Sequence, residues 1–264
     1  MSKSKGNIIP LKDLIKKIGS DLVRINIISS AENLDDADWR DENIPSYLSR
    51  INFITKLVKK LKKASREETK KIDILLISNV QKYIKEATQA YEELRFRTAT
   101  QILLFKFTNE LKEYMERCGG MKKCNRKVLR EALENLIKLL TPLLPHLTEE
   151  WWSLLENHGF ICVAKWPEFE ENKFDQEIEV LEENFKKMLE DISQVLKLVG
   201  KKDKAYFYFS TEKELEFFSE LRKYVKKKFG FKKIFAYLSS DEKRYDPQDK
   251  ASKAKFGKPG IYLE

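Results

Sequence analysis

Apolar residues recur every three or four positions through most of the first 156 residues, which is the period of an amphipathic helix. Between Pro45 and about Glu156, four such runs follow one another with short joins. The fourth run leads into Pro142 and Pro145, which interrupt it and favour a short further helix after them. Four long amphipathic helices with short connections predict an antiparallel bundle over residues 45–158.

The pattern changes on both sides of this bundle. Residues 1–44 indicate a loop and two short helices, with Pro10 inside the first helix and Gly19 just after it. Residues 159–164 are expected to be extended, and the segment 159–175 reads as a linker. The last part, residues 176–264, predicts helices over 177–198 and 212–229 and strands over 205–209, 232–238 and 260–263. The fold class is therefore mainly α, a helical bundle followed by a small α/β domain.

Charge narrows the choice of partner. The 264 residues carry 51 Lys and Arg against 42 Asp and Glu, a net charge of +9, and residues 201–264 hold 17 of these cations against 10 acids. Aromatic residues interleave with the cations, and cations beside stackable rings are what RNA binding requires. The alternative is that the lysines are merely solvated and the rings form a core. Seven cationic residues are the candidate tRNA contacts: Arg95, Arg97, Lys226, Lys227, Lys228, Lys232 and Lys233.

Composition also excludes several classes of function. No apolar run is long enough to span a membrane, and the first residues lack the apolar stretch of a signal peptide, so we expect a cytoplasmic protein. Three cysteines cannot all pair, which favours reduced thiols. Cys118 and Cys124 have no nearby histidine and make a poor zinc site. His146 precedes Glu149 by three residues, but further ligands are missing, so no metal site is predicted and a structural role is expected for His146.

Four short motifs follow one another along the chain. Residues 1–7 read Met-Ser-Lys-Ser-Lys-Gly-Asn, and Asp21-Leu22-Val23-Arg24 comes next. An acidic stretch then ends in Asp38-Trp39-Arg40. The last motif reads Pro-Leu-Leu-Pro-His from residue 142 and continues to Glu149, Glu150 and Trp151. In this order the motifs resemble class I aminoacyl-tRNA synthetases, and the segments 164–167 and 258–264 make the chain most similar to leucyl-tRNA synthetases of the archaeal and eukaryotic type.

This resemblance implies specific roles. Lys3, with Ser2 and Ser4, matches the Lys-Met-Ser-Lys-Ser loop, which acts on the triphosphate of ATP with magnesium in the full enzyme. The chain resembles the C-terminal third of a synthetase, so no cofactor is expected on it and it should be inactive alone. The implied partners are leucine tRNA and the catalytic and editing domains of the same enzyme, in cis or as a separate subunit. The bundle resembles the anticodon-binding domain of the class, and Leu263 and Glu264 are hypothesised to meet the long variable arm of leucine tRNA.

Two alternatives stay open. The corresponding part of a valyl or isoleucyl enzyme shares the loop and the bundle. A stand-alone RNA-binding or assembly module would make residues 1–9 a dispensable tail. A purely structural scaffold would leave the C-terminal charge unexplained.

Overall fold

The computed structural model describes residues 10–33 and 35–264, and the chain forms two compact units. The first unit comprises the chain up to Ala64, then Asn79–Lys112 and Arg126–Glu171. The second comprises Ser65–Ser78, Glu113–Asn125 and Asn172–Glu264. Both units are discontinuous because two long helices each contribute to both of them.

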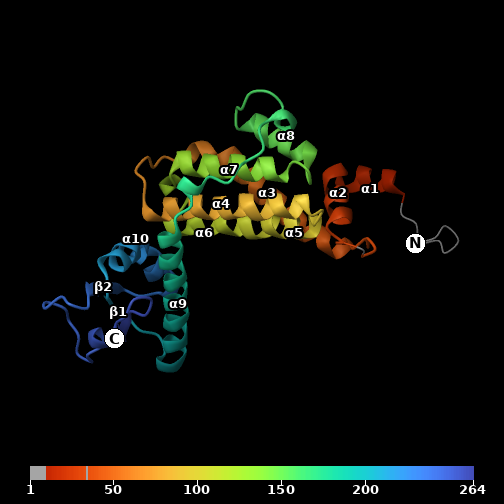
Figure 1. Ribbon diagram of the computed structural model, residues 1–264. Helices are drawn as coiled ribbons and strands as arrows, with labels where there is room; N and C mark the ends of the chain where they lie inside the picture. Colours follow the sequence, from red (N-terminus) through yellow and green to blue (C-terminus); the bar gives the residue numbers. More distant parts are fainter. Residues whose placement is uncertain (1–9, 34) are drawn as a thin grey trace. The chain divides into compact units, whose positions relative to one another are not determined.

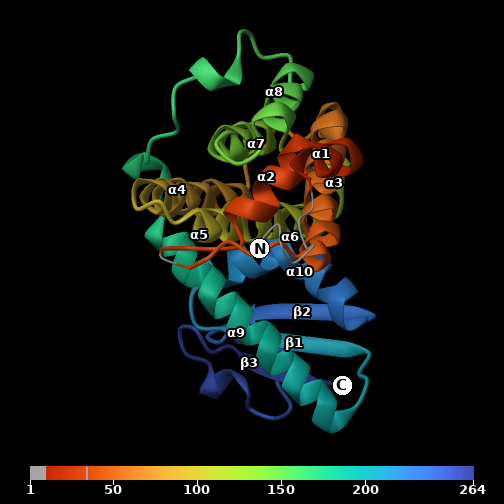
Figure 2. The same ribbon diagram turned by 90° about the vertical axis from the view of Figure 1, so that its right-hand side faces the viewer.

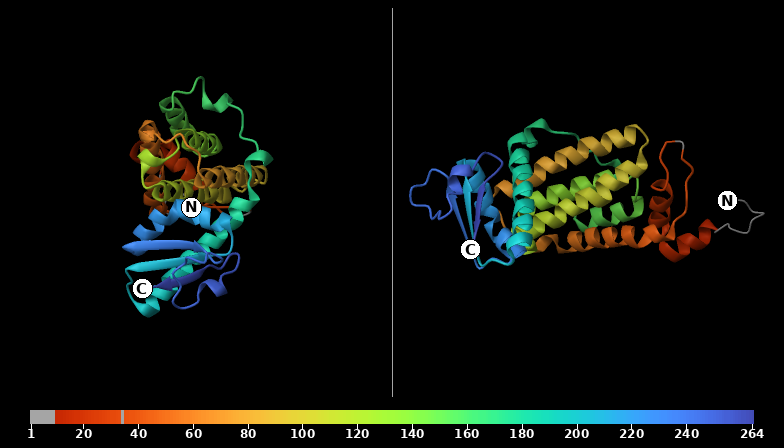
Figure 3. Two further views of the ribbon diagram at one scale, coloured as in Figure 1. Left: turned by 90° about the vertical axis from the view of Figure 1, so that its left-hand side faces the viewer. Right: turned by 90° about the horizontal axis from the view of Figure 1, so that it is seen from below.

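Helices make up the first unit, and α3, α4, α6 and α7 lie alongside one another (Figures 1 and 3). A short π-helical stretch, Gln101–Phe107, joins α5 to α6. Leu103, Phe107, Leu133 and Trp151 are fully buried and belong to the apolar core. The helices of this unit, including those that continue into the second, are α1 (Leu11–Ile18), α2 (Ser20–Ile28), α3 (Ile44–Lys60), α4 (Lys71–Glu92), α5 (Phe96–Thr100), α6 (Thr108–Cys118), α7 (Arg126–Leu140) and α8 (Pro145–Leu154).

The predicted helical runs and the break at the two prolines are confirmed, because α7 ends at Leu140 and α8 begins at Pro145. The turn after α4 contains Leu94, which has a φ of 56° and is 69% exposed. One local expectation is wrong. Residues 159–164 are not extended, because a 3-10 turn forms over Ile161–Val163. The Glu149 carboxylate accepts hydrogen bonds from the backbone N–H of Ile161 (3.0 Å) and Cys162 (3.2 Å), which holds this turn on α8.

The second unit contains a three-stranded sheet with the strand order β2-β1-β3 (Figure 2). Strands β1 and β2 pair in parallel around α10, which confirms the predicted β-α-β unit, and β3 pairs antiparallel with β1. The elements are α9 (Gln176–Val199), β1 (Lys204–Phe209), α10 (Glu212–Phe229), β2 (Lys233–Leu238) and β3 (Gly260–Leu263).

The two faces of the sheet carry different aromatic residues, because successive side chains of β1 point to opposite sides. On the helix-covered face, Phe207 and Phe209 pack on Phe218 of α10 at centroid distances of 4.8 and 5.0 Å. On the other face, Tyr206 stacks on Phe235 at 4.9 Å. The alternation along β1 assigns these rings to two faces, but Tyr206 and Tyr208 are buried on the second face, where they form a small core with Ala251.

A buried ion pair connects α6 to α9 within the second unit. The Arg117 guanidinium donates to both carboxylate oxygens of Glu182, at 2.6 and 2.8 Å, and the two side chains are only 2% and 6% exposed. The guanidinium also lies 5.3 Å from the centroid of the Phe185 ring and 5.8 Å from that of Tyr224. Arg117 thereby contacts both α9 and α10.

A second buried pair holds the start of α4 in the same unit. Arg66 donates to both oxygens of Asp73, at 2.6 and 2.7 Å, and the Tyr114 hydroxyl donates to Asp73 at 2.6 Å. The hydrogen bond with Asp73 raises the pKa of Arg66, so this guanidinium stays charged. The Tyr114 hydroxyl also accepts from the backbone N–H of Asn125, which ties the loop after α6 to this pair.

Removing one member of the Arg117 pair tests how much the unit depends on it. Arg117→Ala removes the buried partner of the Glu182 carboxylate and leaves it beside the exposed Lys186 ammonium at 3.1 Å. We therefore expect a loss of about 3 kcal/mol in unfolding free energy. The exposed pair between Lys213 and Glu177 is the control, and Lys213→Ala should change the unfolding free energy far less, because solvent screens this pair. Hydrogen exchange of α9 and α10 peptides measures the loss of stability in the second unit. Tryptophan fluorescence would not report on it, because all four tryptophans lie in the first unit. Equal protection in both variants would contradict the expectation.

Candidate nucleic-acid interface

The last turn of α10 concentrates positive charge. Thr211 caps the start of this helix by accepting from the backbone N–H of Glu214, and Glu212 and Glu214 lie in its first turn. Lys226, Lys227 and Lys228 occupy its last turn, where cations are favoured by the helix dipole. All three lysines are exposed, so the feature that stabilises the helix end also presents three ammonium groups to solvent.

Lys232 and Lys233 continue this basic surface at the start of β2. Both side chains are exposed, and the Lys232 ammonium pairs with the Asp203 carboxylate at 2.7 Å. The backbone N–H groups of both residues donate to the Asp203 carbonyl, at 2.7 and 3.1 Å. Asp203 therefore fixes the turn that carries the two lysines. A phosphate that binds Lys232 would have to compete with the Asp203 carboxylate for its ammonium group.

The end of the chain is part of the sheet. Leu263 pairs with Ala205 of β1 and lies on the helix-covered face. The Glu264 carbonyl accepts from the N–H groups of Asp203 (3.0 Å) and Lys204 (2.7 Å), so the last residue is anchored by its backbone.

The Glu264 carboxylate is held in one orientation. Its Oε1 accepts from the Lys204 ammonium at 2.7 Å and its Oε2 from the Tyr206 hydroxyl at 3.4 Å. The hydrogen bond from Lys204 lowers the pKa of Glu264, and the same bond raises the pKa of Lys204. Both groups are therefore charged at neutral pH. The carboxylate lies beside the aromatic face of the sheet, whereas Leu263 lies on the opposite one.

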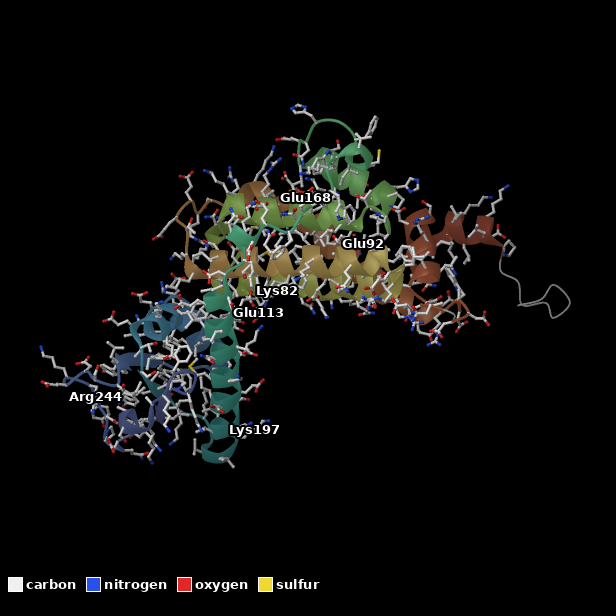
Figure 4. The ribbon with its side chains drawn as sticks, viewed as in Figure 1. Lys82, Glu92, Glu113, Glu168, Lys197 and Arg244 are labelled. Carbon is white, nitrogen blue, oxygen red and sulfur yellow. The ribbon has the colours of Figure 1, made fainter. Side chains whose placement is uncertain are left out.

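That aromatic face is a set of adjoining rings. The Tyr206 ring lies 5.0 Å from Tyr245 and 5.6 Å from Tyr262, in addition to its stack on Phe235. Tyr208 stacks on Tyr237 at 6.1 Å. Tyr245 belongs to the loop after β2, which also carries Arg244 (Figure 4), and its ring is half exposed. Tyr206 and Tyr208 are buried, so the rings that solvent reaches are Tyr245 and, in part, Phe235, Tyr237 and Tyr262. Accessible rings beside cations can stack on nucleotide bases.

Arg95 and Arg97 lie in the first unit, at the start of α5. Arg97 donates to the carbonyl oxygens of Ser29 and Ser30 after α2, and Arg95 pairs with Glu93 at 2.6 Å. These arginines therefore have structural partners. Their contact with tRNA stays a prediction. Such a contact would use the guanidinium N–H groups that do not take part in these bonds.

Two of the sequence motifs contact each other in the first unit. The Asp21 carboxylate accepts from His146 Nδ1 at 2.8 Å and from the backbone N–H of Leu147 at 2.7 Å, so it caps the first turn of α8. Arg24 donates to the Pro142 carbonyl at 3.0 and 3.2 Å. The Asp-x-x-Arg pair thus holds the proline-containing turn between α7 and α8, and His146 is a partner of Asp21.

The structure does not test the predicted catalytic residues. Ser2, Lys3 and Ser4 lie outside the described residues. Within residues 10–33 and 35–264, no group of three or more His, Cys, Asp or Glu side chains could hold a metal ion. Over the same part of the chain, no helix has both the length and the apolar character needed to cross a membrane.

One basic cavity was not predicted. It has a volume of about 670 Å³ and lies in the second unit, between the segment before α4, the loop after α6 and one side of α10. Its cations come from three segments far apart in the sequence, including Lys122, Lys123, Arg222 and Lys223. The basic run near Lys70 and the one in α10 are visible separately in the sequence, but their meeting is a property of the fold.

The comparisons with known proteins agree with this architecture. A family model described as the anticodon-binding domain of tRNA ligase matches residues 73–216. The leucine–tRNA ligase of Pyrococcus abyssi is 34% identical over 248 residues, which covers 92% of this chain and 25% of that enzyme. The leucine–tRNA ligase of Methanocaldococcus jannaschii is 34% identical over 215 residues, which covers 80% of this chain and 22% of that enzyme. The chain thus spans about a quarter of the length of these relatives.

A solved structure of a LeuRS complex also matches this chain. The ternary complex of the Agrobacterium radiobacter LeuRS with tRNA and LeuAMS matches with a TM-score of 0.55 and 25% identity, covering 66% of this chain and 23% of that one. The family model covers more than half of the 264 residues and includes nearly all of α4, the helices α5 to α9, β1 and the start of α10. The chain belongs to the anticodon-binding domain family of tRNA ligases.

Proposed function

We propose that this chain is the tRNA-binding portion of a leucine–tRNA ligase and positions leucine tRNA for ATP-dependent aminoacylation. The identity of about a third with leucine–tRNA ligases over nine-tenths of the chain carries this proposal. The exposed lysines at the end of α10 and the half-exposed Tyr245 supply the two kinds of contact that structured RNA needs. In this role the chain binds and orients, and the transfer of the amino acid belongs to the rest of the ligase.

An apolar surface on the first unit supports a partner within the same enzyme. Helix α1 is strongly amphipathic, yet none of its residues is buried, and Leu11 is 54% exposed. A cavity of about 290 Å³ lies beside it, lined by Leu11, Leu14, Ile27 and Trp39 among others. Unpartnered apolar patches of this kind mark interaction sites. The match to this chain covers only about a quarter of the matched ligase. We therefore propose that the catalytic portion of such a ligase covers this apolar surface.

The charge contribution to tRNA binding is testable with five lysines of the second unit. Replacing all five with glutamine should weaken binding of leucine tRNA at least tenfold and lower the salt slope, because fewer phosphates are neutralised and fewer counterions are released. Filter binding between about 50 and 200 mM salt measures both quantities. The substituted residues are Lys226, Lys227, Lys228, Lys232 and Lys233. If the unmodified chain fails to bind leucine tRNA even at the lowest salt, the proposed function is wrong.

The leucyl proposal is separated from the valyl and isoleucyl alternatives by the long variable arm. An oriented carboxylate can accept hydrogen bonds from base amino groups, so Glu264→Gln should weaken binding of long-armed leucine tRNA about tenfold and leave a short-armed variant unaffected. Lys204→Gln is the matched control, because it breaks the same ion pair and leaves the carboxylate in place. Deleting Leu263 and Glu264 would also remove the backbone pairs to Asp203 and Lys204, so single substitutions are the sharper test. Equal affinity of the unmodified chain for both tRNAs would contradict the proposed contact of Leu263 and Glu264 with the variable arm.

The role of the N-terminal loop is a further part of the proposal. In the complete ligase, Lys3→Ala should lower leucine-dependent ATP–pyrophosphate exchange about a hundredfold, because the variant lacks the cation that meets the developing charge of pyrophosphate. The affinity for tRNA should not change. Lys5→Ala is the control and should have a smaller effect. Unchanged exchange in Lys3→Ala would show that the assignment of residues 1–5 to the Lys-Met-Ser-Lys-Ser loop is wrong.

A further inference from the structure

Three segments line the basic cavity of the second unit, and the segment before α4 contributes Arg66 and Lys70. The other two segments form its cationic walls: the loop after α6 presents Lys122 and Lys123, and one side of α10 carries Arg222, Lys223 and Lys227. All five of these side chains are exposed, so the cavity is open to solvent along its cationic edges. The Lys123 ammonium extends back over the loop and lies 3.6 Å from the position that a β-carbon on Gly119 would occupy.

The cations that line this cavity differ in their partners. The Lys70 ammonium lies 3.9 Å from the Glu68 carboxylate. The guanidinium groups of Arg66 and Arg117 are each neutralised by a buried carboxylate, from Asp73 and Glu182. By contrast, none of the five exposed cations has an ion pair with a carboxylate within the described part of the chain. Two exposed acids, Glu116 and Glu220, also line the cavity. The available charge is therefore strongly positive and is spread over both walls, without a single convergent point.

An aromatic ring lies among these cations. Tyr224 is half-buried in the lining, and its ring is packed against the Arg117 guanidinium on the side of the core. Because Arg117 is fixed by Glu182, the position of this ring is fixed as well. The Lys228 ammonium also lies over this ring, 5.3 Å from its centroid, and donates to the Tyr224 hydroxyl at 3.1 Å. The cavity thus combines exposed cations at its rim with one aromatic side chain that two cations hold in place.

We propose that this cavity, which shares Lys227 with the end of α10, binds the phosphodiester backbone of an RNA strand at a place that does not include the aromatic face of the sheet. Cations on two walls can each neutralise a successive phosphate of a chain that passes between them. A free phosphate or nucleotide would need donors that converge on one point, and Glu116 and Glu220 oppose a small mobile anion. The inference rests on the proposed function, because it assigns a further part of the RNA to this chain.

Cys118 provides a direct probe of the cavity. Its thiol lies in the lining, and a hydrogen bond with Cys124, reinforced by Arg66, lowers the pKa of Cys118, so it is the more reactive of the two thiols. Cys124 is fully buried, and Cys162 is exposed in the first unit, where it serves as an internal control. The rate of alkylation by iodoacetamide can be measured for each cysteine by mass spectrometry under reducing conditions.

In the complete chain, a saturating amount of leucine tRNA should slow alkylation of Cys118 at least fivefold and leave Cys162 within twofold of its free rate. Inorganic phosphate and ATP at millimolar concentration should not protect Cys118. Protection by either small anion at those concentrations would show a free-phosphate site and overturn the assignment to RNA. Unchanged alkylation of Cys118 with tRNA bound would overturn the proposal entirely.

A set of substitutions supplies the second measurement. Changing four lining cations to glutamine should weaken tRNA binding about tenfold and lower the salt slope by about one for each phosphate that is no longer neutralised. These four are Lys122, Lys123, Arg222 and Lys223. The control changes four other lysines of the same unit that do not line the cavity, and it should lower affinity less than threefold. These are Lys187, Lys197 (Figure 4), Lys201 and Lys202.

The outcomes separate this inference from the proposed function. If the unmodified chain binds leucine tRNA and the lining variant matches the control variant, the cavity does not take part in RNA binding and the proposed function stands. If the unmodified chain binds no tRNA, the proposed function itself fails. Since the footprint on Cys118 uses the unmodified protein, a folding defect in the lining variant cannot mask the result.

Discussion

The buried ion pair between Arg117 and Glu182 is the constraint on which the second unit depends. A guanidinium and a carboxylate that are both removed from water are stable only when each satisfies the other, so α6 and α9 must meet at this point. Arg117 also lies against the rings of Phe185 and Tyr224, and its position thereby fixes one turn of α10. The same interaction supports the lining of the basic cavity, because Tyr224 belongs to both. The buried Arg117 thereby positions part of the lining of a cavity whose rim carries exposed lysines.

The cations of this chain divide by residue type. Arg66, Arg97 and Arg117 use their planar, multiple-donor groups to bind carboxylates or carbonyl oxygens within the protein. The lysines at the end of α10 and in the loop after α6 are exposed and keep flexible ammonium groups in solvent. Arginine here fixes the architecture, and lysine supplies most of the charge that an RNA partner would meet. Arg222 is the exception, since it is an exposed arginine on the wall of the cavity.

The elements of the fold could be predicted from the sequence because they depend on local information. The period of apolar residues, the capping Thr211 and the prolines at 142 and 145 act within a few residues, and α10 has the predicted bounds. The turn at Ile161–Val163 could not be predicted, because the Glu149 carboxylate that holds it lies outside the apolar pattern of that segment. The sheet order could not be predicted either, since β3 returns from a long irregular segment to pair with β1.

The candidate interface was predictable in its charge and only partly in its place. The run of lysines in α10 is visible in the sequence, and the structure places it on an exposed helix end. The partners of Arg97 and Arg117 could not be inferred, because they lie 68 and 65 residues away along the chain. The sequence therefore could not distinguish an arginine that is available for RNA from one that is occupied within the fold. The basic cavity was missed for the same reason, since it exists only where three distant segments meet.

The position of the chain's last residue follows from the antiparallel pairing of β3. Because β3 runs opposite to β1, its final residue lies beside the first residues of β1, where Asp203 and Lys204 bind the Glu264 backbone. Lys204 and Tyr206 then orient the carboxylate from the same strand. A group held by backbone pairing and two side-chain donors loses little conformational freedom when a ligand binds, and such preorganisation favours discrimination between partners over mere attraction. The attractive charge of the lysines and the fixed acceptor at the sheet edge are therefore physically distinct contributions, since salt screens the first strongly and the second, a short-range interaction, much less.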